Sequence, residues 1–151
     1  LSSSNINNPN FQSTLLKSGY NLFSKPTTYM NNSGIAVHSI KDYYKIDLEN
    51  IIVIHDDLDL PFGTVKFKIG GGHGGHNGLR SLDAHITKEY IRVRIGIGKP
   101  ADKTDVANYV LSNFSKEELN KLTDIITHTI KAIEALKTED IDQVKSKFTL
   151  K

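Results

Sequence analysis

The segment most able to do chemistry is the glycine-rich run Gly70–Gly78, which holds six glycines, two histidines and an asparagine. Glycine permits positive φ angles and lets a ligand or a second backbone approach closely. His73 and His76 can exchange protons near neutral pH, and the amide of Asn77 is both a donor and an acceptor. The run therefore predicts a binding loop that carries acid–base groups.

A first interpretation of this run is a dinucleotide site. Gly70, Gly72 and Gly75 match the spacing G-x-G-x-x-G, between a predicted strand and a predicted helix. The acidic residue that should bind a ribose after the next strand comes late, at Asp102. The pattern alone is a weak signal, and no Gly-Lys-Ser/Thr follows, which excludes a phosphate-binding P-loop.

A second interpretation is a metal centre. His73 and His76, together with the carboxylates of Asp56, Asp57 and Asp59, are suitable ligands for zinc or manganese. Two histidines three residues apart in a glycine loop are more often hydrogen-bonding groups than ligands. We therefore expect no metal and no cofactor.

A third interpretation is hydrolysis by a general base. Asp56 follows the apolar strand predicted at Ile51–His55, and α/β sheets carry active groups at such strand ends. A carboxylate there can orient a histidine, and this kind of proton transfer contributes roughly 10²–10⁴ in rate. The alternative for Asp56 is a solvated acidic turn. Asn31 can hold a water or a carbonyl oxygen, or Asn31 or Asn32 is simply a helix cap.

Basic residues gather in the middle of the chain, where residues 66–103 include eight basic and three acidic side chains. Lys66, Lys68, Arg92 and Arg94 alternate with apolar residues on two predicted strands, so we expect them on solvent-exposed strand faces. Such a cluster can bind phosphates. An ordinary solvated sheet face fits equally well.

The composition narrows the possible classes. The 151 residues fit one domain, and the absence of cysteine excludes disulfides, thiolate catalysis and cysteine-ligated metal sites. The net charge of +2 does not by itself indicate nucleic acid. No apolar run reaches the roughly 18–20 residues of a membrane span. Residues 1–10 are predicted to be a flexible segment, and a start at Leu1 with Met30 as the sole methionine suggests a fragment.

Strand and helix patterns intersperse along the chain, which predicts an α/β layered domain. A hairpin is expected over Ser13–Lys17 and Tyr20–Lys25. The other expected strands are Ile51–His55, Thr64–Ile69 and Tyr90–Ile97. The first expected helix is capped by Asn32 or Ser33 and runs to about Tyr44. The other expected helices are Leu79–Ile86, Asp105–Leu111, one opening at the Ser115/Glu118 capping box, and Glu139–Phe148.

Four stretches together resemble the bacterial-type peptidyl-tRNA hydrolases. They are Lys25–Gly34 (KPTTYMNNSG), His55–Gly63 (HDDLDLPFG), Lys66–Leu79 (KFKIGGGHGGHNGL) and Arg92–Pro100 (RVRIGIGKP). The resemblance implies one domain over 1–151, with a mixed sheet flanked by helices in a phosphorylase/hydrolase-like layered fold. It further implies a cytoplasmic monomer that needs no cofactor or metal and cleaves the ester between a peptide and the 3′ ribose of tRNA.

The resemblance also implies roles for single residues. Asp56 would hydrogen-bond the catalytic base, Asn31 would position the water or the peptide carbonyl, and Asn77 would hold the peptide or water. His76 would shape the substrate pocket, although chemistry alone would allow it to be the base. The remaining implied substrate contacts are Tyr29 and, for tRNA phosphates, Lys66, Lys68 and Arg92, with a mobile lid over 98–111.

Two motifs of the family have no counterpart in these 151 residues. They are a Gly-Asn-Pro-Gly turn and an Arg-His-Asn motif whose histidine is the general base; their segment also supplies a central strand and a helix. We therefore expect a fold that is incomplete at the N-terminus, with open strand edges. We also expect the polypeptide to be poorly stable and inactive or very weak. The alternative is a non-catalytic RNA-binding relative.

Overall fold

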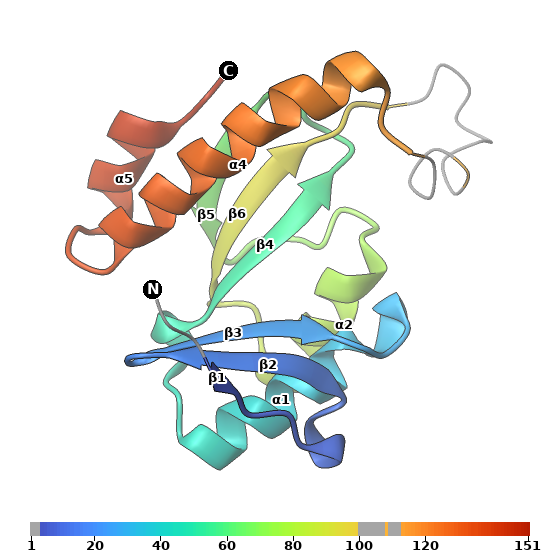
Figure 1. The fold of residues 1–151 in the computed structure, drawn as a ribbon, viewed down its shortest axis with the longest axis vertical. Coiled ribbons are helices and arrows are strands. Elements are labelled where there is room, and N and C mark those ends of the chain that lie inside the picture. Colours follow the sequence, from blue (N-terminus) through green and yellow to red (C-terminus); the bar gives the residue numbers. More distant parts are fainter. Residues whose placement is uncertain (1–3, 100–107, 109–112) are drawn as a thin grey trace. The chain divides into compact units, whose positions relative to one another are not determined.

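The computed structural model describes residues 4–99, 108 and 113–151, and the chain divides into two compact units (Figure 1). Unit 1 comprises Leu1–Ile51 and Gly70–Tyr90, and unit 2 comprises Ile52–Ile69 and Ile91–Lys151. Each unit has its own three-stranded sheet. The chain thus contributes two separate stretches to each unit.

The sheet of unit 1 is antiparallel, in the order β1 (Ser4–Asn5), β2 (Ser13–Ser18), β3 (Asn21–Pro26). The β2–β3 hairpin confirms the expected one. Within the segment expected to be flexible, Ser4 and Asn5 pair with Lys17 and Leu16. The 3₁₀ turn η1 (Pro9–Phe11) follows, and the side chain of Asn8 accepts from the Asn10 amide.

Two helices complete unit 1, α1 (Ser33–Tyr44) and α2 (Asn77–Ile86), and they pack against each other. The short 3₁₀ turns η2 (Met30–Asn32) and η3 (Leu48–Asn50) flank α1 in the sequence. A small apolar core forms where Phe11 and Leu15 meet Ile40 of α1. Burial of such side chains stabilises each by about 1.5–3 kcal/mol.

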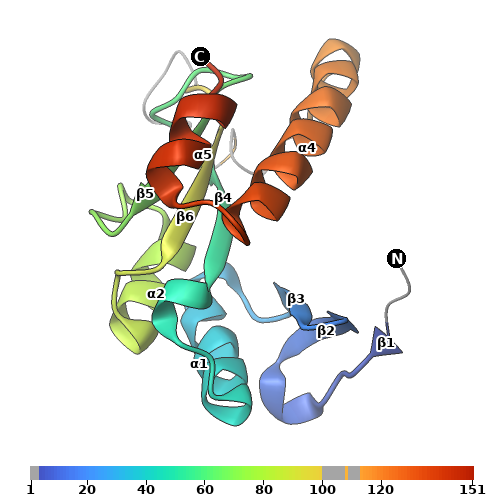
Figure 2. The same cartoon turned by 90° about the vertical axis from the view of Figure 1, so that its left-hand side faces the viewer.

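Unit 2 contains a mixed sheet in the order β4 (Ile52–Asp57), β6 (Ile91–Gly96), β5 (Val65–Ile69). β4 runs parallel to β6, and β5 runs antiparallel to it. The helices α4 (Lys116–Leu136) and α5 (Ile141–Phe148) lie on the same side of this sheet (Figures 1 and 2). They bury a core with β5 and β6, formed by Val65, Phe67, Val93, Ile125, Ala132 and Val144.

Two capping boxes define where these helices begin. Ser115 and Glu118 exchange side-chain and backbone hydrogen bonds at the start of α4, as the sequence predicts. Asp140 and Gln143 form the second box at the start of α5. The helix expected over 105–111 falls outside the described residues except at Asn108.

The α/β class is confirmed, with sheets flanked by helices, but the sheet arrangement differs from the expectation. Among the described residues the strands form two three-stranded sheets, where one mixed sheet was expected. Periodicity identifies strands reliably, whereas which strands pair depends on contacts far apart in the sequence.

An open apolar groove lies beside β4 in unit 2. β4 is an edge strand of its sheet, and among the described residues no strand pairs with its outer edge. Ile54 of β4 and Ile126 and Ile130 of α4 line a groove of about 220 Å³ and are 53%, 50% and 56% exposed. An unpaired strand edge beside exposed apolar side chains agrees with the expectation of an open edge. No helix within the described ranges has the length and apolar character of a membrane span.

Candidate active site

Asp56 lies within a strand, not in a turn as the sequence suggested. It is the second-last residue of β4 and pairs with Ile95 of the parallel strand β6. The ring Nδ1–H of His55 donates to the Asp56 carbonyl at 2.8 Å, and the side chain of His55 is only 8% exposed. The backbone of Asp56 is therefore held by both the sheet and its neighbouring side chain.

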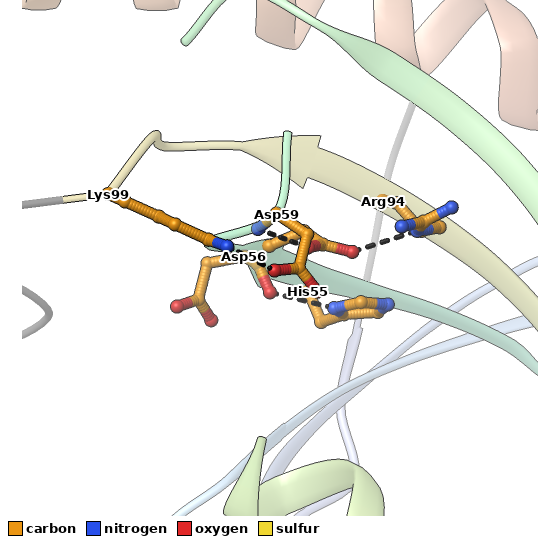
Figure 3. Close-up of polar contacts among 6 residues, drawn as sticks. His55, Asp56, Asp59, Arg94 and Lys99 are labelled. Atoms are coloured by element: carbon orange, nitrogen blue, oxygen red, sulfur yellow. Dashed lines mark hydrogen bonds and ion pairs between the residues drawn. The ribbon is translucent and has the colours of Figure 1, made fainter. Parts of the chain in front are cut away.

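Successive side chains of a strand point to opposite faces of the sheet. Asp56 consequently shares its face with Ile54, while His55 and Asp57 share the other face. Figure 3 shows the Asp56 carboxylate directed away from Arg94, which lies on the second face. The half-buried carboxylate of Asp56 thus stands at the carboxyl end of β4, on the side of the apolar groove.

The turn after β4 is fixed against β6. The Ile97 amide donates to the Asp57 carbonyl at 3.1 Å, and the Gly98 amide donates to the Leu60 carbonyl at 2.9 Å. Gly96 makes this approach possible, because a Cβ there would lie 2.1 Å from the Pro61 carbonyl oxygen. The segment that follows Asp56 is therefore tied at Asp57 and Leu60 to the residues just beyond β6.

Unit 1 holds the other polar residues expected in the site. Tyr29 and Asn31 lie at or next to η2, which contacts α2, and α2 begins at Asn77. All three side chains are exposed, Tyr29 to 85%. Asn32 stands at the N-cap position of α1, as the capping interpretation of this Asn pair expects, but it makes no side-chain capping bond.

Both histidines of the glycine-rich run accept hydrogen bonds from nearby backbone amides. Four of its glycines, Gly70, Gly71, Gly74 and Gly75, adopt positive φ angles, as expected for a run that needs glycine. His73 Nδ1 accepts from the Gly75 amide at 3.0 Å. His76 is the N-cap of α2, and its Nδ1 accepts from the Leu79 amide at 3.2 Å. The run therefore ends in a capped helix whose first residue is Asn77.

The basic cluster forms on one face of the unit 2 sheet, but one member is not exposed. Lys66 pairs with Arg94 and Lys68 pairs with Arg92 across β5 and β6, so all four share a face. The expectation that Arg92 lies on a solvent-exposed face is wrong, because its side chain is 2% exposed. Alternation predicts the face to which a side chain points, and leaves open whether that face is covered.

The ion pair between Arg94 and Asp57 was not predicted, although Arg94 was placed in the basic cluster and Asp57 among the candidate metal ligands. Arg94 Nε donates to Asp57 Oδ2 at 2.8 Å, and the side chains are 26% and 13% exposed. The alternation of basic and apolar residues in β5 and β6 indicates that Arg94 lies on the same face as Lys66, and the two residues pair across the strands. The contact with Asp57 spans 37 positions and has no local signature.

The described residues contain no group of three or more histidine or acidic side chains placed to hold a metal ion. Asp57 and Asp59, two of the acids considered as ligands, are instead occupied by Arg94 and Lys99. These contacts leave the acidic segment without support as a metal centre.

An α/β layered protein with a carboxylate at the carboxyl end of a parallel strand and a polar glycine-rich loop has the architecture in which α/β enzymes place their active groups. A model of the peptidyl-tRNA hydrolase family matches residues 3–151, and the chain belongs to this family. It is 86% identical over its whole length to the peptidyl-tRNA hydrolase of Aliarcobacter butzleri (strain RM4018), covering 82% of that protein. It is 57% identical to that of Sulfurovum sp. (strain NBC37-1), covering 80%.

Solved structures agree with this assignment. The crystal structure of the Acinetobacter baumannii peptidyl-tRNA hydrolase superposes with a TM-score of 0.88 at 34% identity, over 95% of this chain and 76% of that one. A mutant of the same enzyme gives a TM-score of 0.90 over 97% of this chain. A family match over residues 3–151 gives no support to the expectation that the polypeptide is inactive.

Proposed function

We propose that the protein hydrolyses the ester that joins a peptide to the ribose of tRNA. Water adds to the ester carbonyl, the bond to the ribose oxygen breaks, and the products are a peptide carboxylate and a tRNA with a free hydroxyl. The observation that carries the proposal is Asp56, whose backbone is held at the carboxyl end of β4 in a chain 86% identical to a peptidyl-tRNA hydrolase. No metal or cofactor is assigned to this reaction.

In this proposal Asp56 orients the histidine that removes a proton from the attacking water and stabilises its protonated form. None of the six histidines of the sequence falls in the motif that the family resemblance gives to that base. The ring of each of the six also contacts another residue. His38 lies beside the carboxylate of Asp42, and the other five rings hydrogen-bond backbone atoms: His55 with Asp56, His73 with Gly75, His76 with Leu79, His85 with Ser81 and His128 with Phe148. We therefore assign the base to none of them.

The exposed amides of unit 1 are proposed to handle the substrate. Asn31 positions the water or the peptide carbonyl, and Asn77 holds the peptide or water, since an amide offers both a donor and an acceptor. Tyr29, which is largely exposed, supplies a face for the substrate. Their support is their exposure and the contact of η2 with α2.

His76 is proposed to shape the pocket as well as to cap α2. We expect His76→Ala to slow ester hydrolysis but leave residual turnover, and to lower the free energy of unfolding by about 0.5–2 kcal/mol through the lost cap. His76→Asn, which retains a capping side chain, should recover the stability but not the turnover. Urea unfolding and steady-state kinetics separate the two effects. Loss of all turnover in His76→Ala would instead make His76 the base.

Lys66 and Lys68 are proposed to contact tRNA phosphates. Arg92 was expected to do the same, but its burial removes it from this proposal and Arg94, beside Lys66, takes its place. We expect Lys66→Ala with Lys68→Ala to weaken binding to every tRNA alike and to reduce the slope of log affinity against log salt by about 1.4–1.8. Filter binding at several salt concentrations measures this. The matched control is Lys121→Ala with Lys131→Ala, two exposed lysines on α4, which should leave the slope unchanged.

The function is tested by ester cleavage of a labelled peptidyl-tRNA. The 151-residue polypeptide is compared with the protein expressed from its complete coding sequence, whose upstream codons are read first. Hydrolysis by the latter supports the proposal, and the ratio of the two rates decides whether the polypeptide itself is active. Tight tRNA binding without hydrolysis by either would favour a non-catalytic RNA-binding relative.

We also propose that residues 1–151 form one peptidyl-tRNA hydrolase domain that acts as a cytoplasmic monomer. The support is a single family model that runs through both units. Light scattering coupled to gel filtration should give the mass of one chain, 16.8 kDa for these residues. The open groove beside β4 is the feature that would drive association if a larger mass were found.

A further inference from the structure

Asp57 uses both of its carboxylate oxygens inside the protein. Oδ1 accepts from the Asp59 amide at 2.8 Å, and Oδ2 accepts from Arg94 Nε, also at 2.8 Å. Its side chain is only 13% exposed, in contrast to Asp59, which is 58% exposed and pairs with Lys99 at 3.0 Å. Two charged neighbours in the same acidic segment therefore differ sharply: both carboxylate oxygens of Asp57 are hydrogen-bonded, and Asp59 is largely exposed.

The contacts of Asp57 join three pieces of backbone. Its side chain ties the end of β4 to the turn through the Asp59 amide and to β6 through Arg94. Its carbonyl accepts from the Ile97 amide just beyond β6. Charge-assisted hydrogen bonds of this kind are roughly twice as strong as neutral ones. Asp57 thus connects the end of β4 to β6 and to the turn that follows β4.

Asp56 lies directly before this anchor, with its side chain on the opposite face. Replacing Asp57 removes no atom of the Asp56 carboxylate and no residue on its face of the sheet. It releases the ties of the strand end to Arg94 and to the turn, and it leaves both supports of the Asp56 backbone, the sheet and the His55 ring. A misplacement of about 1 Å at a catalytic group can cost about 10²-fold in rate.

We propose that Asp57 is a positioning residue, which holds Asp56 in its working orientation by tying the end of β4 to Arg94 and to the turn. This rests on the proposed role of Asp56 in ester hydrolysis. The basic side chain of Arg94 is fixed by the same bond, so Asp57 also links the basic face of the sheet to the strand end that carries Asp56.

Kinetics on the protein expressed from its complete coding sequence provide the first test. We expect Asp57→Ala to lower kcat by at least about tenfold with little change in KM, and Asp57→Glu to recover part of the loss. Asp57→Asn, which keeps an oxygen for the Asp59 amide but loses the charge, should fall between them. The matched control is Asp59→Ala in the same turn, which should leave kcat unchanged. A kcat within about twofold of wild type in folded Asp57→Ala would overturn the proposal.

A readout that does not depend on activity separates this proposal from the function itself. In Asp57→Asn and Asp57→Ala, the carboxyl carbon resonance of Asp56 should shift, and the amides of Asp59 and Ile97 should exchange with solvent faster. Unchanged signals at these positions would contradict the positioning role whatever the activity. If wild type showed no hydrolysis while these signals moved, the proposed function would fail and the positioning role would stand. Should Asp57→Ala fail to fold, Asp57→Asn decides by the same signals.

Discussion

Asp56→Asn is expected to lower kcat for peptidyl-tRNA hydrolysis by about 10²–10⁴-fold in the protein expressed from its complete coding sequence. The amide has the shape of the carboxylate, but it carries no charge to stabilise a protonated histidine. KM should change little, because Asp56 is proposed to act on the base and not on the bound tRNA. Single-turnover cleavage of a labelled substrate, together with steady-state kinetics, measures the two constants.

The control for this substitution is Asp59→Asn, three residues further along. Asp59 is exposed and pairs with Lys99 at the surface, where an ion pair contributes about 0–1 kcal/mol. Both variants should unfold at nearly the wild-type urea concentration, since neither changes the volume of a side chain. An Asp56→Asn enzyme that retained more than about a third of the wild-type kcat would remove Asp56 from the proposed mechanism.

The element boundaries beside Asp56 and Asn77 were easier to predict from the sequence than the surroundings of the candidate site residues. Asp56 and Asn77 stand out because each lies at the boundary of a predicted element, and both boundaries are close to those observed. The burial of Arg92 was missed because alternation fixes only the direction of a side chain. Lys68, its partner across the sheet, is exposed as expected. Two side chains of one type on one face thus differ in exposure for reasons that only the tertiary structure contains.

For the fold, too, features set by neighbouring residues were predicted, and features set by distant contacts were not. The hairpin, α1 and the capping box at Ser115 depend on residues close together in the sequence, and all three were predicted. The pairing of Ser4 with Lys17, in a polar segment without apolar alternation, was not. Nor was the division of the strands between two sheets, because register and partner choice depend on contacts between distant segments.

Close packing of α1 on α2 explains a glycine that no turn requires. Gly34 lies in the first turn of α1, is buried, and its amide donates to Ser81 Oγ of α2 at 2.9 Å. A Cβ at Gly34 would lie 2.2 Å from the Ser81 carbonyl oxygen and 2.5 Å from its carbon. These are backbone atoms, so no change of rotamer can relieve the contact. The two helices can be this close only without a side chain at Gly34.

We therefore expect Gly34→Ala to destabilise the protein by about 3 kcal/mol, at the upper end of the usual cost of overpacking. The effect should appear as a lower midpoint in urea unfolding with an unchanged slope. The matched control is Gly72→Ala in the glycine-rich run, where a Cβ meets nothing within 4 Å and φ is not positive. Equal midpoints for the two variants would mean that α1 and α2 adjust without cost.

Gly34→Ala should also reduce turnover at temperatures where the variant is folded. Asn31 belongs to η2, which leads directly into α1, and Asn77 is the first residue of α2. Forcing the helices apart moves these two amides relative to each other, within one unit and without touching either side chain. Activity should consequently fall more than the folded fraction does, by about tenfold for a shift well under 1 Å. Turnover that simply followed the folded fraction would show that the spacing of Asn31 and Asn77 does not matter to the reaction.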